Sequence, residues 1–496
     1  MSDIKIYKKD EINLFLEFTD RSIGFELQDV FSYYVTGYKH MPKYKAGIWD
    51  GKIKLFNIKT RTFPYGLIVD LIRFCNNYEY TYELMGEIKL VNLKQDIVEF
   101  KNKIESITKM SIVDEYQFQF DAIEQLVKYN KALLKSPTAS GKSNIIYMLL
   151  RFFLEVEEGD ILICVPAVSL VDQLFNDFID YTNDDFNTEN NCHRIYAGKD
   201  KNSNKRVIIT TWQSIFRLDS DWFTRFGVFI CDEAHQADGA SLTKIINNMP
   251  DVKYRFGLTG TLDGTKIHEL QMRALFGPII DPTSSKKLMD SGVLANLVIE
   301  CDVLVYTKDE IAHVKKYCKT YQDEIEWLVN NEKRNRFIIA KAFNQTNNTL
   351  VLFNFIEGHG QKLFDFAKNK AEEFKKQVFF IHGGVKVEER EEIRRIAEYS
   401  NNIIIFASYG TFSQGVNVRN LHSVIFAHPF KSKIRNLQSI GRILRKHESK
   451  KEAKLIDIGD DLSTKSQQNI TYLHFIERLK IYNDEQFDYR IHRHTI

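Results

Sequence analysis

The stretch Ser136-Pro-Thr-Ala-Ser-Gly-Lys-Ser143 determines the fold class that we predict for this chain of 496 residues. It follows the apolar run Ala132–Leu134 and opens a helical pattern at Lys142–Glu155. This strand–loop–helix order is that of a phosphate-binding loop, whose backbone N–H groups surround an anion at a helix N-terminus. Lys142 would reach the β- and γ-phosphates of a nucleotide, and the Ser143 hydroxyl would ligate Mg²⁺. Ser136 stands where the pattern usually has Gly, and a chance Gly-Lys-Ser turn is the alternative interpretation.

A second motif, Val228-Phe-Ile-Cys-Asp-Glu-Ala-His235, is an apolar strand that ends in two carboxylates. Burial of this strand leaves Asp232 and Glu233 at the carboxyl edge of a parallel sheet, where open α/β folds bind ligands. Asp232 can then hold Mg²⁺, directly or through water, while Glu233 polarises an attacking water molecule. The alternative is a solvated acidic turn before a helix, which the phosphate-loop pattern upstream makes the weaker interpretation.

Two series of short apolar runs, rich in β-branched and aromatic residues, alternate with amphipathic helical patterns along most of the chain. Near-continuous apolar strands separated by helices are typical of parallel sheets covered on both faces. We therefore predict two α/β lobes. The strands expected in the first lobe are Ala132–Lys135, Asp160–Val165, Val207–Thr210, Val228–Cys231 and Tyr254–Leu258, and those expected in the second are Leu350–Phe355, Gln377–His382, Asn402–Ala407, Ser423–Ala427 and Ala453–Ile458.

These patterns divide the chain into four predicted segments, in keeping with roughly 150 residues per domain. Residues 1–105 hold many Tyr, Phe and Lys together with turn signals, which fits a small α+β module. The first lobe is expected over residues 106–285 and the second over 286–465, with a polar, turn-rich boundary at Asp281–Leu294. Residues 466–496 have the pattern of a short helical C-terminal extension.

The composition is that of an ordinary globular protein, with 44% hydrophobic and 27% charged residues. Because 68 Lys and Arg stand against 66 Asp and Glu, the net charge is only +2, and a nucleic acid would have to be bound by local patches. The six cysteines form no CxxC pair, which argues against a zinc ribbon and fits a reducing cytosol. The longest apolar stretch, Ile145–Leu154, is broken by Arg151, and no signal peptide is apparent. We expect a cytoplasmic protein with no membrane partner.

The ordered motifs resemble those of the superfamily-2 helicases and translocases of nucleic acid, over about residues 110–460. Tyr116-Gln117 resembles the adenine-recognition element of these proteins, and the phosphate loop and the Asp-Glu-Ala-His sequence resemble motifs I and II. Single members of such a series are weak signals, whereas the complete order is specific. The remaining matches are Val165–Leu174 with motif Ia, Thr210–Ser214 with Ib, Leu258–Thr261 with III, Val351–Asn354 with IV, Ala407–Val416 with V and Gln438–Arg445 with VI.

Further segments resemble the UvsW-type recombination and repair helicases of tailed bacteriophages, namely Gly47–Leu55, Phe63–Leu67 and Val293–Asn296. The resemblance implies two tandem RecA-like lobes after a small α+β N-terminal domain. It also implies an ATP- and Mg²⁺-dependent enzyme that remodels branched DNA, including replication forks, recombination intermediates and R-loops. The expected partners are forked or branched duplexes with single-stranded regions, and RNA–DNA hybrids. A monomer in the cytoplasm of an infected bacterium is the corresponding expectation.

The resemblance assigns nucleotide-binding roles to residues of both lobes. Arg442 and Arg445 would stabilise the transferring γ-phosphoryl, because guanidinium groups are planar and bidentate donors. Both are expected in one helix, where residues three apart share a face, and a basic helix face over Ile434–Lys454 is the alternative. Gln438 would approach the γ-phosphate, and Gly415 would allow a close approach in motif V. The first-lobe residues that would bind ATP are Tyr116, Gln117, Ser136, Thr138, Ser140, Gly141, Lys142 and Ser143.

Coupling and nucleic-acid contacts complete the expected site. His235, Thr259 and Thr261 would connect ATP hydrolysis to the polymer, although each could also be a simple turn or helix-start residue. Hydroxyls position phosphates without reading bases, which favours Thr211, Ser408 and Thr411 as backbone contacts, with N-capping as the alternative. In the N-terminal segment, aromatic residues are interleaved with lysines, a pattern that suits contacts with phosphates and unpaired bases. Of the aromatic residues, Trp49 and Phe56 fit a hydrophobic core better. The lysines proposed to contact nucleic acid are Lys43, Lys45, Lys52 and Lys54.

Two other functions compete with a branched-DNA helicase at this level. The first is the motor subunit of a restriction system, or a DEAH-type RNA helicase. The second is a non-catalytic scaffold that clamps ATP and nucleic acid. Intact Lys142, Asp232, Glu233 and both arginines speak against the scaffold, and the position of the extra domain before the motor speaks against the restriction subunit.

Overall fold

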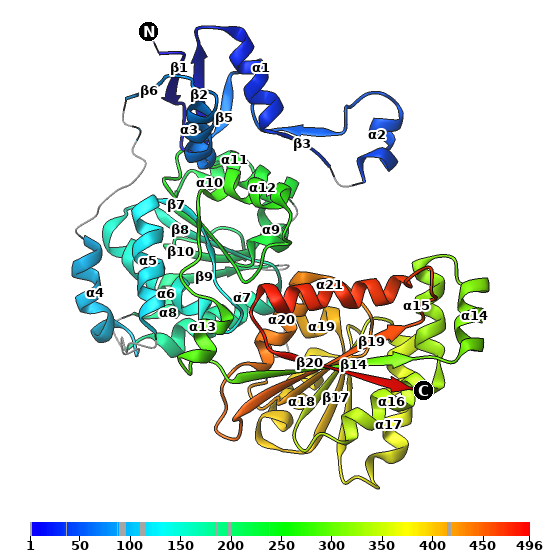
Figure 1. The fold of residues 1–496 in the computed structure, drawn as a ribbon. Coiled ribbons are helices and arrows are strands. Elements are labelled where there is room, and N and C mark those ends of the chain that lie inside the picture. Colours follow the sequence, from blue (N-terminus) through cyan, green and yellow to red (C-terminus); the bar gives the residue numbers. More distant parts are fainter. Residues whose placement is uncertain are drawn as a thin grey trace. The chain divides into compact units, whose positions relative to one another are not determined.

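The computed structural model describes residues 2–35, 37–86, 88, 96–109, 116–183, 186–196, 200–237, 239–413 and 418–496, and its contacts divide the chain into two compact units (Figure 1). The first unit comprises Met1–Ser136 and Gly141–Pro282, and the second comprises Pro137–Ser140 and Thr283–Ile496. The first unit contains the N-terminal module (residues 2–86) and the first lobe (residues 96–282) apart from Pro137–Ser140. The second lobe consists of residues 283–496. No helix within the described ranges is long and apolar enough to cross a membrane.

A parallel sheet forms the centre of the first lobe, with seven strands in the described residues in the order β13-β7-β12-β11-β8-β10-β9. All five predicted strands are present. The sequence patterns missed β9 and β13, because strands of four and two residues at the sheet edges carry too few apolar side chains to form a pattern. The bounds are β7 (Lys131–Lys135), β8 (Asp160–Val165), β9 (Cys192–Ile195), β10 (Val207–Thr211), β11 (Phe226–Cys231), β12 (Tyr254–Thr259) and β13 (Ile279–Ile280).

Helices cover both faces of this sheet, so alternate residues of each strand enter different cores. In β8, Ile163 packs with helices α5–α7 in one core, whereas Leu162 packs with Leu242 of α11 in the other. The strands are therefore apolar at nearly every position, which is why the sequence revealed them. The helices are α4 (Asp96–Ile107), α5 (Gln117–Tyr129), α6 (Lys142–Val156), α7 (Val168–Tyr181), α8 (Thr188–Asn191), α9 (Trp212–Ile215), α10 (Ser220–Phe223), α11 (Gly239–Asn247) and α12 (Lys266–Phe276).

The second lobe has its own parallel sheet, again with seven strands in the described residues, in the order β16-β17-β15-β18-β19-β14-β20. Five of these strands were predicted. The strands are β14 (Asn296–Val305), β15 (Thr349–Phe353), β16 (Gln377–Ile381), β17 (Ile403–Ser408), β18 (Ser423–Phe426), β19 (Glu452–Asp461) and β20 (Tyr489–Thr495). The helices are α13 (Ser285–Asp290), α14 (Lys308–Tyr317), α15 (Tyr321–Asn330), α16 (Glu332–Phe343), α17 (Gln361–Ala371), α18 (Val387–Tyr399), α19 (Tyr409–Ser413), α20 (Lys433–Ile443) and α21 (Ile470–Asp484).

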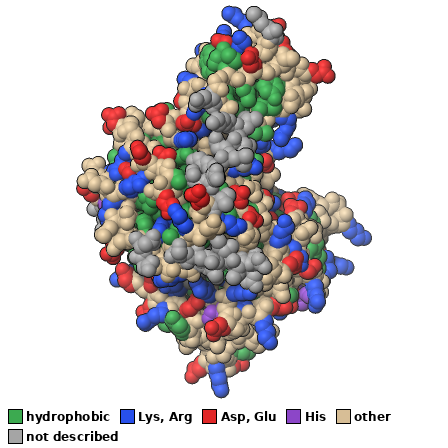
Figure 2. Space-filling view, turned by 90° about the vertical axis from the view of Figure 1, so that its left-hand side faces the viewer, with side chains coloured by type: hydrophobic (Ala, Val, Ile, Leu, Met, Phe, Trp, Pro, Cys, Tyr) green, Lys and Arg blue, Asp and Glu red, His purple; other side chains and the backbone are tan. Residues whose placement is uncertain are grey.

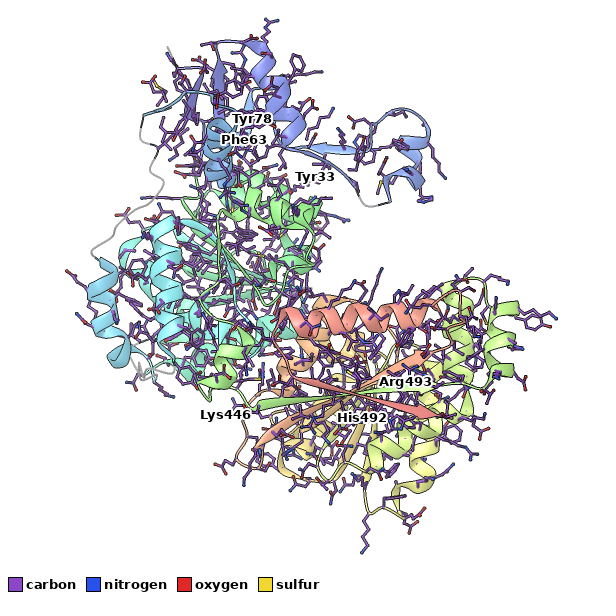
Figure 3. All side chains as sticks on the ribbon, in the orientation of Figure 1. Tyr33, Phe63, Tyr78, Lys446, His492 and Arg493 are labelled. Atoms are coloured by element: carbon purple, nitrogen blue, oxygen red, sulfur yellow. The ribbon has the colours of Figure 1, made fainter. Side chains whose placement is uncertain are left out.

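The C-terminal extension is only partly helical, which corrects the sequence-based prediction. Helix α21 ends at Asp484, and β20 then joins the sheet as an edge strand parallel to β14. The sequence of β20, Tyr-Arg-Ile-His-Arg-His-Thr, is basic and mostly exposed, as Figure 3 shows for His492 and Arg493. An edge strand of this composition has no apolar alternation. Its pairing is instead stabilised by a hydrogen bond of 2.7 Å between His494 Nε2 and buried Asp302.

Two buried ion pairs stabilise the connection from β18 to α20. The guanidinium of Arg334 pairs with Asp460 at 2.8 Å, and that of Arg478 pairs with Asp457 at 2.7 Å, all four side chains being inaccessible to solvent. Each arginine also donates to a backbone carbonyl of the connection, Arg334 to Ala427 and Arg478 to Phe430. These bonds satisfy carbonyl groups that belong to no helix or strand ladder.

The N-terminal module is a mixed four-stranded sheet in its described residues, with helices α1 (Arg21–Val30) and α3 (Ile68–Asn77) packed on it. In the order β5-β2-β1-β6, β1 is antiparallel to β2 and parallel to β6. Its exposed hydrophobic side chains include Phe25 and Tyr78, and hydrophobic groups gather among charged ones on the module at the top of Figure 2. The strands are β1 (Ile4–Lys8), β2 (Asn13–Phe18), β5 (Thr62–Pro64) and β6 (Tyr82–Met85).

An arm extends from the module between α1 and β5. It consists of the two-stranded pair β3 (Ser32–Tyr34) and β4 (Lys52–Lys54), with the short helix α2 (Pro42–Lys45) between them (Figure 1). The module itself contacts the first lobe through charged side chains. Glu11 pairs with Lys131 of β7 at 2.5 Å, and Asp70 of α3 pairs with Arg273 of α12 at 2.5 Å.

Candidate active site

The phosphate loop connects β7 to α6 and has the backbone geometry of an anion site. The N–H of Ser136 donates to the carbonyl of Thr259 at the end of β12, which fixes the start of the loop. Ala139 and Gly141 have φ values of +69° and +86°, in the left-handed region. At Gly141 a Cβ atom would lie 2.4 Å from the amide nitrogen of Gln119, so both the backbone and the space require glycine. The N-terminus of the 15-residue helix α6 follows directly, and its unpaired N–H groups favour an anion.

Lys142 and Glu233 lie together although they are distant in the sequence. The Nζ atom of Lys142 is 3.6 Å from Oε1 of Glu233 and 3.4 Å from the carbonyl oxygen of Ser136. Both side chains are largely buried, at 10% and 17% exposure. The predicted phosphate ligand and the predicted base therefore share one site at the carboxyl edge of the sheet.

Asp232 follows β11 directly, and its carboxyl group is buried beside a second carboxylate. Its N–H donates to the carbonyl of Cys164, and its Oδ1 accepts from the N–H of Glu233 at 2.9 Å. Burial and the neighbouring charge of Glu233 raise the pKa of Asp232 to about 7, whereas Lys142 acts in the opposite direction. A hard divalent cation would remove this electrostatic cost. The half-buried hydroxyl of Ser143, next to Lys142, supplies a second oxygen ligand of the kind that Mg²⁺ prefers.

Glu233 adopts a left-handed backbone conformation, with φ at +46°. Such a conformation is uncommon for a residue other than Gly, Asn or Asp, and strain of this kind is concentrated at functional sites. It lets the side chain of Glu233 approach Lys142 on one side and His235 on the other, where Oε2 is 3.3 Å from Nδ1.

A chain of hydrogen bonds joins the residues predicted for coupling, beginning at His235, which lies beside Glu233. The hydroxyl of Thr259 donates to the carbonyl of Thr261 at 2.8 Å, so at 2.6 Å it accepts from Nδ1 of His235. This assigns the proton of the neutral ring to Nδ1. Burial lowers the pKa of His235, which favours this neutral form. The structure therefore brings motifs II and III together, and the three residues occupy neither solvated turns nor isolated caps.

The helix before the loop also places against the phosphate loop a glutamine that the sequence motifs did not single out, Gln119. Gln117 donates to Asp121 of its own helix at 2.8 Å, and Tyr116 is 38% exposed. Gln119 is the buried neighbour that packs against Gly141, and its side-chain oxygen accepts from Asn144 of α6 at 2.7 Å. The helical spacing of the sequence could have indicated that Gln119 faces inward, because residues 119, 122, 123 and 126 lie on the buried face of α5.

Motif VI lies on α20 and beyond it. Gln438 and Arg442 are one turn apart on this helix and half-buried, so they share a face. Arg445 lies outside the helix, which ends at Ile443, and the expectation of one helical face for both arginines is wrong. The chain leaves the helix at Leu444, and no Gly or Pro directly follows Ile443 in the sequence to signal this end. Gly415 lies outside the described residues.

The predicted backbone contacts form equivalent hydroxyl pairs in the two lobes. At the end of β10 the hydroxyls of Thr211 and Ser214 are 2.9 Å apart, and at the end of β17 those of Ser408 and Thr411 are also 2.9 Å apart. Thr211 stands at the N-cap position of α9, yet its side chain makes no capping bond. Both pairs lie at the carboxyl ends of parallel strands.

The arm carries the four predicted lysines on a small aromatic cluster. Lys43 and Lys45 are exposed on α2, Lys54 on β4 pairs with Asp50 at 2.9 Å, and the ammonium of Lys52 lies 5.2 Å from the Tyr34 ring centre. Within the arm the rings of Tyr34 and Tyr38 stack with their centres 4.5 Å apart, the Tyr44 ring meets Tyr38 edge to face at 4.8 Å, and Tyr34 is 48% exposed. As expected, Phe56 is fully buried in the module core, whereas Trp49 is half-exposed and donates to the carbonyl of Lys52.

Comparisons with known proteins match the whole chain. Residues 3–85 match the family described as "DNA helicase UvsW, N-terminal", residues 103–264 "Type III restriction enzyme, res subunit", and residues 332–447 "Helicase conserved C-terminal domain". The ATP-dependent DNA helicase uvsW of Enterobacteria phage T4 is 34% identical over 506 residues, which cover 98% of each chain. The DNA 3'-5' translocase XPB2 of Sulfurisphaera tokodaii is 24% identical over 409 residues, which cover 75% of this chain and 88% of the relative.

A solved structure agrees with these matches. The crystal structure of T4 UvsW aligns with a TM-score of 0.53 at 32% identity and covers 99% of both chains. The match therefore includes the N-terminal module as well as the two lobes, and the motif series is complete in the expected order. The chain belongs to the UvsW family of ATP-dependent, superfamily-2 DNA helicases.

Proposed function

We propose that this protein remodels branched DNA by hydrolysing ATP with Mg²⁺ at the site around Lys142 and Glu233. The observation that carries the proposal is the buried group around Glu233, whose carboxylate lies 3.6 Å from Lys142 of the sequence-distant phosphate loop and 3.3 Å from His235. A structural lysine or a solvated acidic turn would not form this arrangement. The N-terminal match, which lies outside the motor lobes, favours a UvsW-type remodelling enzyme over a restriction motor or an RNA helicase.

Each residue of the site has a distinct role in the proposed reaction. Lys142 and the loop N–H groups bind the phosphates, and Ser143 and Asp232 hold Mg²⁺, which neutralises charge on the phosphates. Glu233 orients the attacking water molecule and accepts its proton. Gln438, Arg442 and Arg445 contribute donors to the γ-phosphoryl. We retain Thr138, Ser140 and Gly415 as phosphate contacts and Tyr116 and Gln117 as adenine contacts, and add Gln119 as a residue that shapes the loop.

His235 is the residue through which hydrolysis and DNA contact are linked. Loss of the γ-phosphate changes the charge next to Glu233, and the shared hydrogen bond passes this change to Thr259 and Thr261. The hydroxyl pairs at Thr211 and at Ser408 and Thr411 bind the DNA backbone in the two lobes, and residues 1–105 hold the branched part of the substrate. The enzyme acts as a monomer. As its phage relative suggests, it acts in the cytoplasm of an infected bacterium.

Replacing Glu233 by Gln tests the proposed function. The amide keeps the size of the side chain but neither polarises water nor accepts its proton, so kcat for ATP is expected to fall by roughly 10²–10⁴-fold. ATP binding is retained because Lys142 and the loop are unchanged. ATPase rates and strand displacement are measured on forks, four-way junctions, RNA–DNA hybrids and duplex RNA.

The matched control is Glu124→Gln, the same substitution at an exposed position of α5 in the same lobe. Unchanged turnover in Glu233→Gln would remove this residue as the base. Wild-type protein that binds ATP and DNA without hydrolysis would instead identify the non-catalytic scaffold. Preference for duplex RNA would identify an RNA helicase.

The arm lysines are expected to supply a salt-dependent part of DNA affinity. We replace Lys43, Lys45, Lys52 and Lys54 together by Gln. For each of these lysines that contacts a phosphate, the slope of log Kobs for DNA binding against log salt concentration is expected to decrease in magnitude by up to about one. The contribution of Lys54 is smaller because Asp50 pairs with it. Fluorescence anisotropy with forked DNA at several salt concentrations measures the slope. The charge-matched control replaces four exposed lysines of the second lobe, Lys315, Lys316, Lys368 and Lys370; an equal slope in both variants would reduce the arm to a structural element.

A further inference from the structure

Lys450 is a buried cation that the helicase motifs do not include. It is 6% exposed, and its ammonium group donates to three backbone carbonyls, those of Arg419 at 2.6 Å, Ile443 at 3.0 Å and Arg445 at 2.9 Å. Three acceptors match the three N–H donors of a lysine. Burial lowers the pKa of Lys450 to about 7, so retaining an amine here costs stability that an exposed lysine would not.

The three carbonyls belong to the two segments that follow motifs V and VI. Arg419 comes shortly after the motif V segment, and Ile443 is the last residue of α20, directly after Arg442. A cation at a helix C-terminus satisfies orphan carbonyl groups and interacts favourably with the helix dipole. Lys450 therefore caps the C-terminal end of α20 and connects this end to the segment that follows motif V.

Arg445 depends on this contact more than a helical residue would. It lies two residues beyond the last residue of the helix. Its carbonyl is bound by Lys450, and the carbonyl of the preceding Leu444 accepts from the N–H of Ala295. Tertiary hydrogen bonds therefore hold the peptide units on both sides of the Arg445 Cα, and so constrain the backbone from which its side chain extends.

A second set of hydrogen bonds joins the same two segments. Ser449 donates to the side chain of Asn420 at 3.1 Å, and His422 lies within hydrogen-bond distance of both. Asn420 in turn donates to the carbonyls of Ala397, Glu398 and Ser400 at the end of α18. Lys450 therefore acts within a rigid frame, and its three bonds are not isolated surface contacts.

We propose that Lys450 is a positioning residue for ATP hydrolysis, which ties the carbonyl after motif V to the end of the motif VI helix and so orients Arg442 and Arg445. The inference rests on the proposed role of these arginines. Lys450 does not touch the nucleotide itself. Because α20 ends between Arg442 and Arg445, Arg445 lies beyond the helix, and the hydrogen bonds of Lys450 hold this part of the chain.

Replacing Lys450 by Met tests the proposal, because methionine keeps the length and loses all three donors. Displacing a catalytic group by about 1 Å costs up to roughly 10²-fold in rate, so kcat is expected to fall by about 10–100-fold. The KM for ATP and the affinity for a fluorescent ATP analogue are expected to stay within about 3-fold, because Lys142 and the phosphate loop are unchanged. Lys450→Arg, which retains a cationic donor, is expected to recover part of the loss.

The matched control is Lys446→Met, the same substitution at an exposed lysine of the same segment, labelled in Figure 3. It is expected to behave as the wild type. A positioning role also predicts non-additivity: Lys450→Met added to Arg442→Ala and Arg445→Ala should lower kcat no further than those two changes alone. A purely structural lysine would instead lower kcat additively and in proportion to the loss of folded protein.

Ser449→Ala keeps the test decisive if Lys450→Met does not fold. It removes one neutral hydrogen bond from the same frame, so kcat is expected to fall by about 2–10-fold at unchanged KM. The inference is overturned if kcat is unchanged in both Ser449→Ala and Lys450→Met. It is also overturned if the effect of Lys450→Met on kcat adds fully to the effects of Arg442→Ala and Arg445→Ala. If Arg442→Ala and Arg445→Ala leave hydrolysis intact, the proposed role of the arginines fails first, so the two failures are distinguishable.

Discussion

Replacing Lys142 by Ala is expected to abolish ATP hydrolysis while the protein stays folded and still binds DNA. The ammonium group lies 3.6 Å from Glu233, and its charge also acts on Asp232. Its loss removes a phosphate ligand whose charge is most valuable in a partly desolvated site, and removal of one such donor costs roughly 10²–10³-fold in kcat. The loss of Mg²⁺ affinity adds to this effect.

The pKa of Asp232 explains why Mg²⁺ binding is lost as well. Lys142 lowers this pKa, which burial and Glu233 already raise to about 7. Without Lys142 the pKa rises further, so at neutral pH the carboxyl group is mostly protonated and no longer an anionic ligand. Residual activity of Lys142→Ala should therefore increase as the pH rises above 7, in contrast to a wild-type profile that levels off at lower pH.

Lys142→Ala is checked by ATPase rates, binding of a fluorescent ATP analogue, DNA anisotropy and thermal melting. The control is Lys244→Ala, which removes an exposed lysine of α11 in the same lobe. If Lys142→Ala unfolds the protein, the lysine is a structural core residue and the phosphate-loop assignment is wrong. If turnover is unchanged, the site lies elsewhere.

Replacing Arg442 and Arg445 by Ala is expected to lower kcat by about 10³–10⁵-fold, the range found for guanidinium groups that stabilise a transferring phosphoryl. The KM for ATP should change far less, because the charge that these groups stabilise develops mainly in the transition state. Lys should not substitute for Arg at either position, since an ammonium cannot donate in a planar, bidentate manner.

The control for the arginines is Arg435→Ala, an exposed arginine on the first turn of the same helix. The two single variants also separate the positions. Arg442 lies within α20, whereas the carbonyl of Arg445 is bound directly by Lys450, so Arg445→Ala should mask more of the effect of Lys450→Met than Arg442→Ala does. A loss that appears in KM alone would mean that the arginines bind substrate without stabilising the transition state.

The parallel strands were predictable because their burial on both faces leaves an apolar side chain at nearly every position. β8 and β17 are examples, with five or six buried residues in a row. β14 was not predicted, although it pairs with β19 along its whole length. Its first half alternates buried and half-buried residues, and it follows the polar, turn-rich segment Asp281–Leu294 that indicated the boundary between lobes. β20 is basic and exposed, and only its pairing with β14 makes it a strand.

The sequence alone determined the chemistry present at the site, because the loop around Lys142, the carboxylates at 232 and 233, and the pair of arginines are each read from a few adjacent residues. Only the tertiary structure decided how these groups act. The bond from His235 to Thr259, the packing of Gln119 against the phosphate loop and the bond from Lys450 to Arg419 each join residues well separated in the sequence, and the burial that raises the pKa of Asp232 depends on the surrounding sheet. Burial and hydrogen-bond partners across such distances depend on how the sheets bring strand ends together, and no local pattern of residues encodes that.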